Sequence, residues 1–415
     1  MRLEKFSIGI GDRFAHQGRA QLAAIIKAKQ QGCNIVPVWN KSNREHSIIG
    51  TKPADTRKEA DEAVKMLGWK DSYYVDADHI NLNTVDLFIE ASNFFTLDVA
   101  DYIGQKCDQK DLSAFIAQNK KYIGKIEIPG IGGKLNVTQN DLEKIGAKFL
   151  LAVKKAGEIY RHTAEKKGAE NFVTEVSMDE SNQPQSPVEM LFILSAIAAE
   201  KIPAQTIAPK FTGRFNKGVD YVGDVKQFEK EFNEDIAVIN FAIREFGLPA
   251  NLKLSVHSGS DKFSIYTPMK KAIKRFNAGL HLKTAGTTWL EEIIGLALAG
   301  GCGLDIAKEV YQQALEHFDE LCAPYATVID IDKSKLPSPD EVAKWDGVKF
   351  AKVLRHDQKC KDYNPNFRQL IHIGYKIAVK MGHCYIEALE KYEDTIAKTV
   401  TENIYDRHIK RVFID

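Results

Sequence analysis

The chain has 415 residues, of which 44% are hydrophobic and 27% are charged. This length suits one large α/β domain with an appendage, or a few smaller domains. The 57 basic and 56 acidic residues leave a formal net charge of +1. Because they are interspersed, no long-range field favours nucleic acid or an anionic membrane, and we expect neither as a partner.

The N-terminal residues lack the apolar stretch of a signal peptide, and no run approaches the ~20 apolar residues of a membrane span. The 6 cysteines are dispersed without a CxxC pair. This spacing is typical of reduced thiols and not of a disulfide framework or a structural zinc site. We therefore expect a cytoplasmic protein.

Short apolar runs alternate with amphipathic stretches over the first 286 residues. The alternation predicts an α/β fold, a (β/α)8 TIM barrel with a C-terminal helical extension. A doubly wound sheet is the alternative, but Phe14 stands where a dinucleotide-binding loop would carry its third glycine. The expected strands lie at residues 6–11, 34–39, 72–79, 94–98, 171–180, 205–211, 254–263 and 279–286.

Two segments depart from this alternation. Residues 101–170 form a long excursion with an expected hairpin or extended turn at 125–133 and a helix at about 139–166. Beyond residue 287 strand signals nearly vanish, and the helical patterns lie at 288–300, 303–322, 340–353 and 384–410. We predict a barrel domain at 1–300 with an insertion around 101–170, and a helical extension at 301–415 packed on the barrel.

Histidines stand near the ends of two consecutive expected strands. In barrel enzymes the carboxyl ends of the strands carry the site, and neighbouring strands lie about 5 Å apart. His257 and His281 could therefore share one divalent metal, with Asp179 or Glu180 as a carboxylate ligand and His79 as a fourth candidate. A single histidine is more simply a satisfied core residue, but this combination favours a site.

The segment Asp76-Ala-Asp78-His79 places both carboxylates on one face of a strand. One could act as a general base while the other orients His79, although a helix cap and turn explain the spacing equally well. Lys210 and Lys283 could polarise a substrate oxygen, bind a carboxylate or form a Schiff base. Ordinary salt bridges explain either lysine equally well.

Arginines and a polar loop complete the set of candidate residues. Arg13 and Arg368 are candidate forks for a carboxylate, since guanidinium binds it in bidentate fashion. The segment Ser258-Gly-Ser-Asp261-Lys262 offers hydroxyl and backbone N–H groups to sugar or phosphate oxygens, or is a capped loop. The residues alone thus indicate a metal-assisted barrel enzyme that acts on a small polyhydroxylated anion.

Several longer motifs resemble bacterial tagaturonate epimerases. The most specific are Leu254-Ser-Val-His-Ser-Gly-Ser-Asp-Lys-Phe263 and His281-Leu-Lys-Thr-Ala-Gly-Thr287. Gly11-Asp-Arg13, Asp76-Ala-Asp-His79 and Arg368-Gln-Leu-Ile-His372 also match, so the likeness covers most of the chain. The resemblance implies a metal-dependent isomerase of hexuronate catabolism that interconverts tagaturonate and fructuronate, with some members also acting on tagatose and fructose.

The resemblance also implies roles for the candidate residues. Because the inverted carbon is β to the ketone, retro-aldol cleavage and re-addition is a reasonable route, and transient oxidation would need a nicotinamide that no fingerprint indicates. The expected cofactor is a divalent metal ion, and the ligand types suit Zn, Mn, Ni, Co or Fe. The implied metal ligands are His79, Glu180, His257 and His281; the catalytic candidates are Asp78, Asp179, Lys210 and Lys283; the substrate-binding candidates are Arg13, Ser258, Asp261, Lys262, Arg368 and His372.

Other readings of the same residues stay open. A metal-dependent sugar aldolase or ketose isomerase would use a similar barrel mouth, and a sugar-acid binding protein would retain the pocket without turnover. The expected partner is a small sugar acid or ketose. A homo-oligomer is compatible with the sequence.

Overall fold

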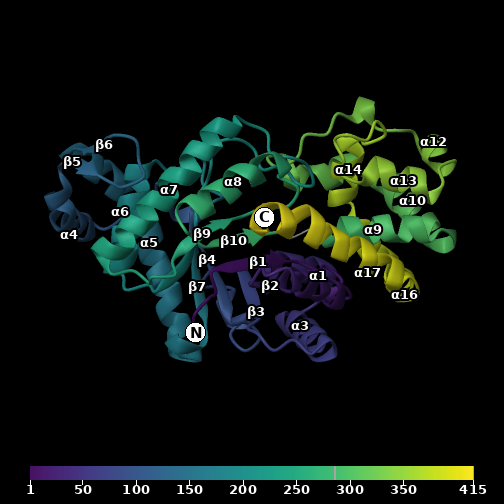
Figure 1. Ribbon diagram of the computed structural model, residues 1–415, viewed down its shortest axis with the longest axis horizontal. Helices are drawn as coiled ribbons and strands as arrows, with labels where there is room; N and C mark the ends of the chain where they lie inside the picture. The colour runs from purple at the N-terminus through teal and green to yellow at the C-terminus, as the bar shows by residue number, and fades with distance from the viewer. Residues whose placement is uncertain (285–286, 415) are drawn as a thin grey trace.

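The computed structural model describes residues 1–284 and 287–414. A closed barrel of parallel strands lies at its centre, in the order β1-β10-β9-β8-β7-β4-β3-β2 (Figure 1). Its strands are β1 (Phe6–Ile10), β2 (Ile35–Ser42), β3 (Tyr74–Ile80), β4 (Phe94–Asp98), β7 (Val173–Ser177), β8 (Ala204–Ala208), β9 (Lys253–Val256) and β10 (Leu280–Lys283). Each overlaps one predicted run, so the predicted (β/α)8 barrel is confirmed.

The strands are buried on both faces, as parallel strands covered by helices must be. All residues of β7, β8, β9 and β10 are buried. Such strands normally carry only apolar side chains. The ionisable residues inside them include Glu175 on β7, Lys253 on β9 and Lys283 on β10, and such residues are therefore informative.

Helices surround the barrel and follow its strands in sequence. Those of the barrel are α1 (Gly18–Gln30), α2 (Asn43–Ile49), α3 (Pro53–Leu67), α5 (Gln139–Lys167), α6 (Pro187–Ala199), α7 (Val225–Phe246), α8 (Phe263–Arg275) and α9 (Thr287–Ala299). The start of α6 is encoded locally, because Ser186 and Glu189 form a capping box and Pro187 occupies the first turn.

The excursion before α5 forms a small outlying unit. It contains α4 (Gln109–Asn119) and an antiparallel hairpin of β5 (Gly124–Glu127) and β6 (Lys134–Val137), at the left of Figure 1. The predicted hairpin is confirmed, and α5 covers the barrel beside β4. The assignment of the insertion as part of a domain at 1–300 remains a prediction.

The C-terminal part is helical throughout, as predicted, but its helices are shorter than the sequence pattern suggested. An N-cap interrupts one of them: the Asp346 side chain accepts a hydrogen bond from the Lys349 N–H and starts a helix inside the predicted 340–353 segment. The elements are α10 (Gly301–Glu316), α11 (Phe318–Cys322), α12 (Pro339–Ala343), α13 (Gly347–Leu354), α14 (Pro365–Ile373), α15 (Tyr375–Met381), α16 (His383–Lys391), α17 (Glu393–Glu402), a π-helical segment (Asn403–Ile409) and α18 (Lys410–Phe413).

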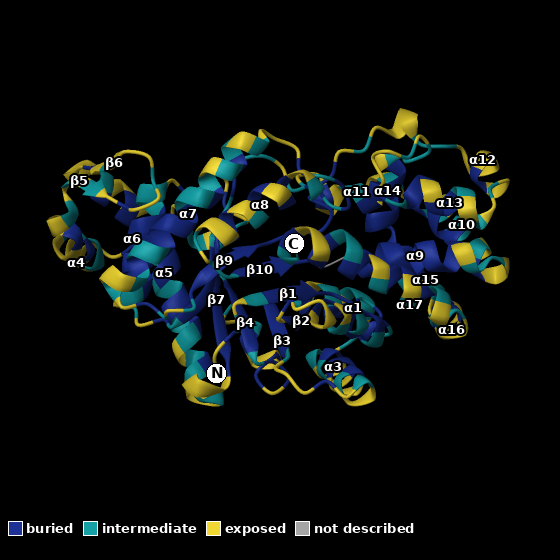
Figure 2. Ribbon diagram, viewed as in Figure 1, coloured by how far each residue is buried: buried dark blue, intermediate teal, exposed yellow. Residues whose placement is uncertain are grey.

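Two main apolar cores hold these parts together. One joins the barrel strands to α5, α6, α7 and α8, and the other joins α1 and α9 to the C-terminal helices. Buried residues accordingly run from the strands through α9 into the helices at the right of Figure 2. Within residues 1–284 and 287–414, no helix combines the length and apolar composition needed to cross a membrane.

Candidate metal centre and active site

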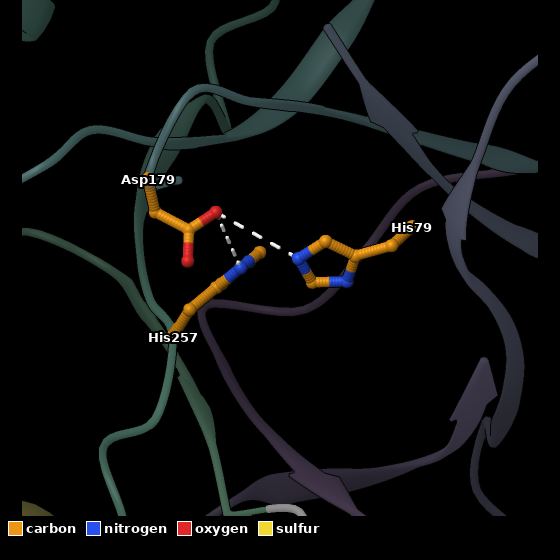
Figure 3. A group of neighbouring side chains, drawn as sticks. All are labelled: His79, Asp179 and His257. Carbon is orange, nitrogen blue, oxygen red and sulfur yellow. Dashed lines mark ion pairs between the residues drawn. The ribbon is translucent and has the colours of Figure 1, made fainter. Parts of the chain in front are cut away.

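Three side chains converge at the carboxyl end of the barrel. His79 lies at the end of β3, Asp179 just beyond β7 and His257 just beyond β9, and all three point toward one another (Figure 3). The Asp179 Oδ1 atom is 3.1 Å from His257 Nδ1 and 3.7 Å from His79 Nε2. One nitrogen or oxygen atom from each residue lies within 4.8 Å of the others.

The remaining ring nitrogen of each histidine meets a buried carboxylate. His79 Nδ1 donates to Asp78 Oδ1 at 2.8 Å, and His257 Nε2 donates to Glu175 Oε1 at 2.7 Å. Histidines that bind metals are usually held in this way, because the hydrogen bond fixes the tautomer and aims the other nitrogen at the ion. His257 Nδ1 is buried and faces the Asp179 carboxylate at 3.1 Å. Two imidazoles and a carboxylate therefore fit a divalent transition metal.

The electrostatics of this group favour positive charge between the residues. Burial alone would lower the pKa of His257, but Asp179 and Glu175 raise it to about 9. Burial would likewise raise the pKa of Asp179, yet His257 and His79 hold it well below its usual range. Such a pocket stabilises either protons on the histidines or a metal cation in their place.

His79 also has a backbone conformation that residues other than glycine rarely adopt. Its φ of 53° lies in the left-handed region, which costs roughly 1–3 kcal/mol for a residue other than glycine. The surrounding structure must therefore hold the residue there. Conformations of this kind concentrate at functional sites.

Lys283 connects the two carboxylates that hold the histidines. Its Nζ lies 2.8 Å from Asp78 Oδ1, 3.1 Å from Glu175 Oε1 and 2.9 Å from Asp76 Oδ2. Burial opposes a charge here, but Asp76 and its neighbouring carboxylates raise the pKa of Lys283 well above its ordinary value. A protonated amine is not a nucleophile, so the geometry favours ion pairing over Schiff-base chemistry for this lysine.

Glu180 and His281 were expected as metal ligands, and the structure brings neither into this group. Glu180 is exposed, whereas Asp179 turns inward and accepts a hydrogen bond from Ser177 Oγ. His281 lies deeper in the barrel because it pairs in register with Ser255, two residues before His257. Its Nδ1 is 2.9 Å from Ser7 Oγ, and burial lowers its pKa to about 3.

Most of the expected substrate-binding residues after β9 make contacts within the protein. The Arg368 guanidinium donates to the Asp261 carboxylate, and both side chains are buried. Lys262 Nζ donates to the Val219 and Ser260 carbonyl groups. The motif residues Ala285 and Gly286 lie outside the described residues.

The other candidates differ in how accessible they are. Ser258 is exposed, with a φ of 52°. Lys210 is half-buried, and its Nζ lies 3.4 Å from the Asp179 carbonyl oxygen. Arg13 and His372 each retain a buried nitrogen with no hydrogen-bond partner among the described residues. These two residues are therefore available to a ligand.

Comparison with known proteins identifies the family of the chain. The family model described as UxaE, tagaturonate epimerase, matches residues 1–412. The chain belongs to the tagaturonate epimerase family. This membership confirms the predicted resemblance and places the chain among the isomerases.

Similar proteins cover nearly the whole chain. A tagaturonate/fructuronate epimerase from Thermotoga maritima is 28% identical over an alignment 419 residues long, which covers 97% of this chain and 80% of that protein. The native structure of a fructuronate-tagaturonate epimerase from Cohnella laeviribosi matches with a TM-score of 0.81 and 22% identity. A one-glycerol complex of the same enzyme gives a TM-score of 0.78 and 23% identity. Each match covers 99% of this chain and 82% of the Cohnella laeviribosi chain. At this level of identity the two matches show the fold alone.

Two residues beside this candidate site were absent from the predicted set. Glu175 holds His257, and a charged residue at the centre of an otherwise uncharged strand is a signal that could have identified it. Asp98 is the last residue of β4. This strand lies between β7, which precedes Asp179, and β3, which contains His79. Asp98 is half-buried, and burial raises its pKa.

Proposed function

We propose that this protein interconverts tagaturonate and fructuronate with the help of a divalent metal held by His79, Asp179 and His257. The observation that carries the proposal is the pair of carboxylates, Asp78 and Glu175, that hold the two histidines. Buried carboxylates in these positions have a clear purpose if the histidines bind a cation. The names of the matched relatives support the substrate assignment.

The proposed reaction is a retro-aldol cleavage followed by re-addition. A base removes the proton of the hydroxyl group on the inverted carbon, the bond toward the ketone-bearing fragment breaks, and that fragment takes the electron pair as an enediolate. The aldehyde fragment then rotates and accepts the same carbon on its other face, and the base returns its proton to the new alkoxide. A divalent ion at the three ligands would supply Lewis-acid stabilisation of negative charge on substrate oxygens.

The structure supports a division of roles among the acidic residues. Asp179 is a metal ligand in the proposed arrangement, and Asp78 is occupied by His79 and Lys283. Asp98 is the better candidate for the base, because it is partly accessible at the barrel mouth between β3 and β7. Lys283 keeps Asp78 and Glu175 in place, and Lys210 is a candidate contact for a substrate oxygen.

The test combines elemental analysis of the purified protein with product analysis after incubation with tagaturonate. We expect near one metal per chain, fructuronate formation that stops with a chelator, and loss of both in His257→Ala. His383→Ala is a matched control because His383 is exposed and pairs, among the described residues, with Glu387 on its own helix. Full activity of His257→Ala would exclude the proposed site.

Product analysis also separates the alternative function. A metal-dependent aldolase would release the two fragments, and a ketose isomerase would move the carbonyl group. Either outcome in the presence of bound metal would retain the metal site and reject the epimerase. A homo-oligomeric state remains a prediction.

A further inference from the structure

Cationic side chains surround two tyrosines beside the barrel mouth. The hydroxyl groups of Tyr325 and Tyr375 lie 3.0 Å apart. The Arg13 guanidinium lies 4.3 Å from the centre of the Tyr375 ring, and Arg44 and Lys217 lie 5.1 and 5.7 Å from the centre of the Tyr325 ring. Arginine and lysine bind aromatic faces in this way, but the rings carry no net charge.

This cluster has little negative charge to balance it. Among the described residues, Glu45 is the carboxylate within ion-pair distance of Arg13, with its Oε1 3.4 Å from Nε. Neither Lys217 nor Arg44 forms an ion pair with any described residue. Arg13 Nη1 and His372 Nδ1 are buried, and neither has a hydrogen-bond partner among the residues that the structure describes. Buried donors and charges left in this state are costly, and a bound anion would satisfy them.

The pKa values of two groups agree with an excess of positive charge. Burial and the charge of Arg13 lower the pKa of Lys217. Burial, followed by the charges of Arg13 and Lys217, holds the pKa of His372 well below its usual range. His372 is therefore a neutral imidazole that can donate one hydrogen bond without adding to the repulsion.

Hydrogen bonds connect this cluster to the metal ligands. Lys41, near the end of β2, donates from Nζ to the Arg13 carbonyl oxygen at 2.9 Å. The preceding residue, Asn40, lies with its Nδ2 3.5 Å from Asp78 Oδ2, and Asp78 holds His79. The cationic cluster and the metal ligands thus belong to the same rim of the barrel.

We propose that Arg13, Lys217 and His372 bind the carboxylate of the sugar acid, while the reacting carbons face His79, Asp179 and His257. The inference rests on the proposed function and adds the group that would distinguish a uronate from a neutral ketohexose. A neutral sugar leaves the buried donors unsatisfied, and a site of this kind discriminates strongly against such a ligand. Arg368, the other sequence candidate for this role, already has Asp261 as its anion.

Equilibrium binding tests the inference without requiring turnover. Calorimetry would measure the affinity of the metal-loaded protein for tagaturonate and for tagatose in the wild type, Arg13→Gln and Lys217→Met. Each variant should weaken tagaturonate binding by at least about tenfold and change tagatose binding less than about twofold, because a charge-assisted contact is lost with one ligand only. Arg19→Gln is the matched control, since it removes the same charge from an arginine that pairs with Glu393 at the surface.

The outcomes separate this inference from the function on which it rests. Tight tagaturonate binding that depends on Arg13 and Lys217, without formation of fructuronate, would retain the carboxylate site and reject the epimerase. Epimerase activity with unchanged tagaturonate affinity in both variants would do the reverse. Equal weakening of both sugars would also overturn the inference. Lys217→Met provides an independent measurement should Arg13→Gln fail to fold, and thermal melts would reveal such a failure.

Discussion

Replacement of Glu175 by glutamine is the sharpest test of how the barrel prepares a metal site. Glu175 is 0% exposed, and its Oε1 accepts hydrogen bonds from His257 Nε2 and Thr96 Oγ1 and forms an ion pair with Lys283 Nζ at 3.1 Å. Its Oε2 has no hydrogen-bond partner among the described residues. A glutamine can therefore keep its carbonyl oxygen at the Oε1 position and place its amide at the Oε2 position, so the variant loses charge with little change of shape.

The expected effect follows from the role of this carboxylate. Loss of a carboxylate that orients and polarises a ligating histidine weakens metal binding by roughly 10- to 100-fold, or about 1.4–2.7 kcal/mol. The fold should survive, because Asp76 and Asp78 still pair with Lys283.

The measurement is a competition titration of the metal-free protein with zinc against a chromophoric chelator. Glu180→Gln provides the control, since it makes the same chemical change five residues away at an exposed position. Its zinc affinity should stay within about twofold of the wild type, which is the range expected away from the ligands. Wild-type affinity in Glu175→Gln, or a larger loss in Glu180→Gln, would refute the reasoning.

Three further predictions concern other parts of the molecule. Asp261→Asn leaves the fully buried Arg368 without its anion, so the free energy of unfolding in urea should fall by about 3–5 kcal/mol. An unchanged urea midpoint would mean that the ion pair contributes nothing to stability. Burial lowers the pKa of Lys253 from 10.5 to about 7, so the unfolded chain binds more protons between these values and stability should rise with pH there. The rise has a slope of up to about 1.4 kcal/mol per pH unit, and Lys253→Met should lack it. Parallel curves of stability against pH for the two proteins would contradict the lowered pKa of Lys253. His281→Gln should retain the full metal content in elemental analysis, whereas metal loss would return His281 to the ligand set.

The barrel was predictable because its information is local. Runs of buried apolar residues mark each strand, and signals such as Ser186 with Pro187 mark where a helix begins. The register between strands is not local. His257 and His281 both stand near strand ends in the sequence, but the register offsets them by two residues, or about 6.6 Å along the strands.

Side-chain direction beyond a strand was equally inaccessible from the sequence. Asp179 and Glu180 are neighbours with the same chemistry, and the loop after β7 turns one inward and leaves the other exposed. Asp261 and Arg368 are 107 residues apart, and they become a buried ion pair only where the C-terminal helices meet the loop after β9. The sequence thus identified the residue types of the site but not all of their partners.

The packing of α17 against α1 has a consequence for how the protein is made. Thr401 Oγ1 donates a hydrogen bond to the Ala20 carbonyl oxygen across 381 residues of chain, and both helices belong to one apolar core. At a synthesis rate of roughly 5–20 residues per second, the partner of α1 leaves the ribosome about 20–80 s after α1 itself. α3 can cover part of α1 soon after synthesis, but the surface of α1 that packs on α17 stays exposed during that time, so the nascent chain presents apolar surface until translation ends.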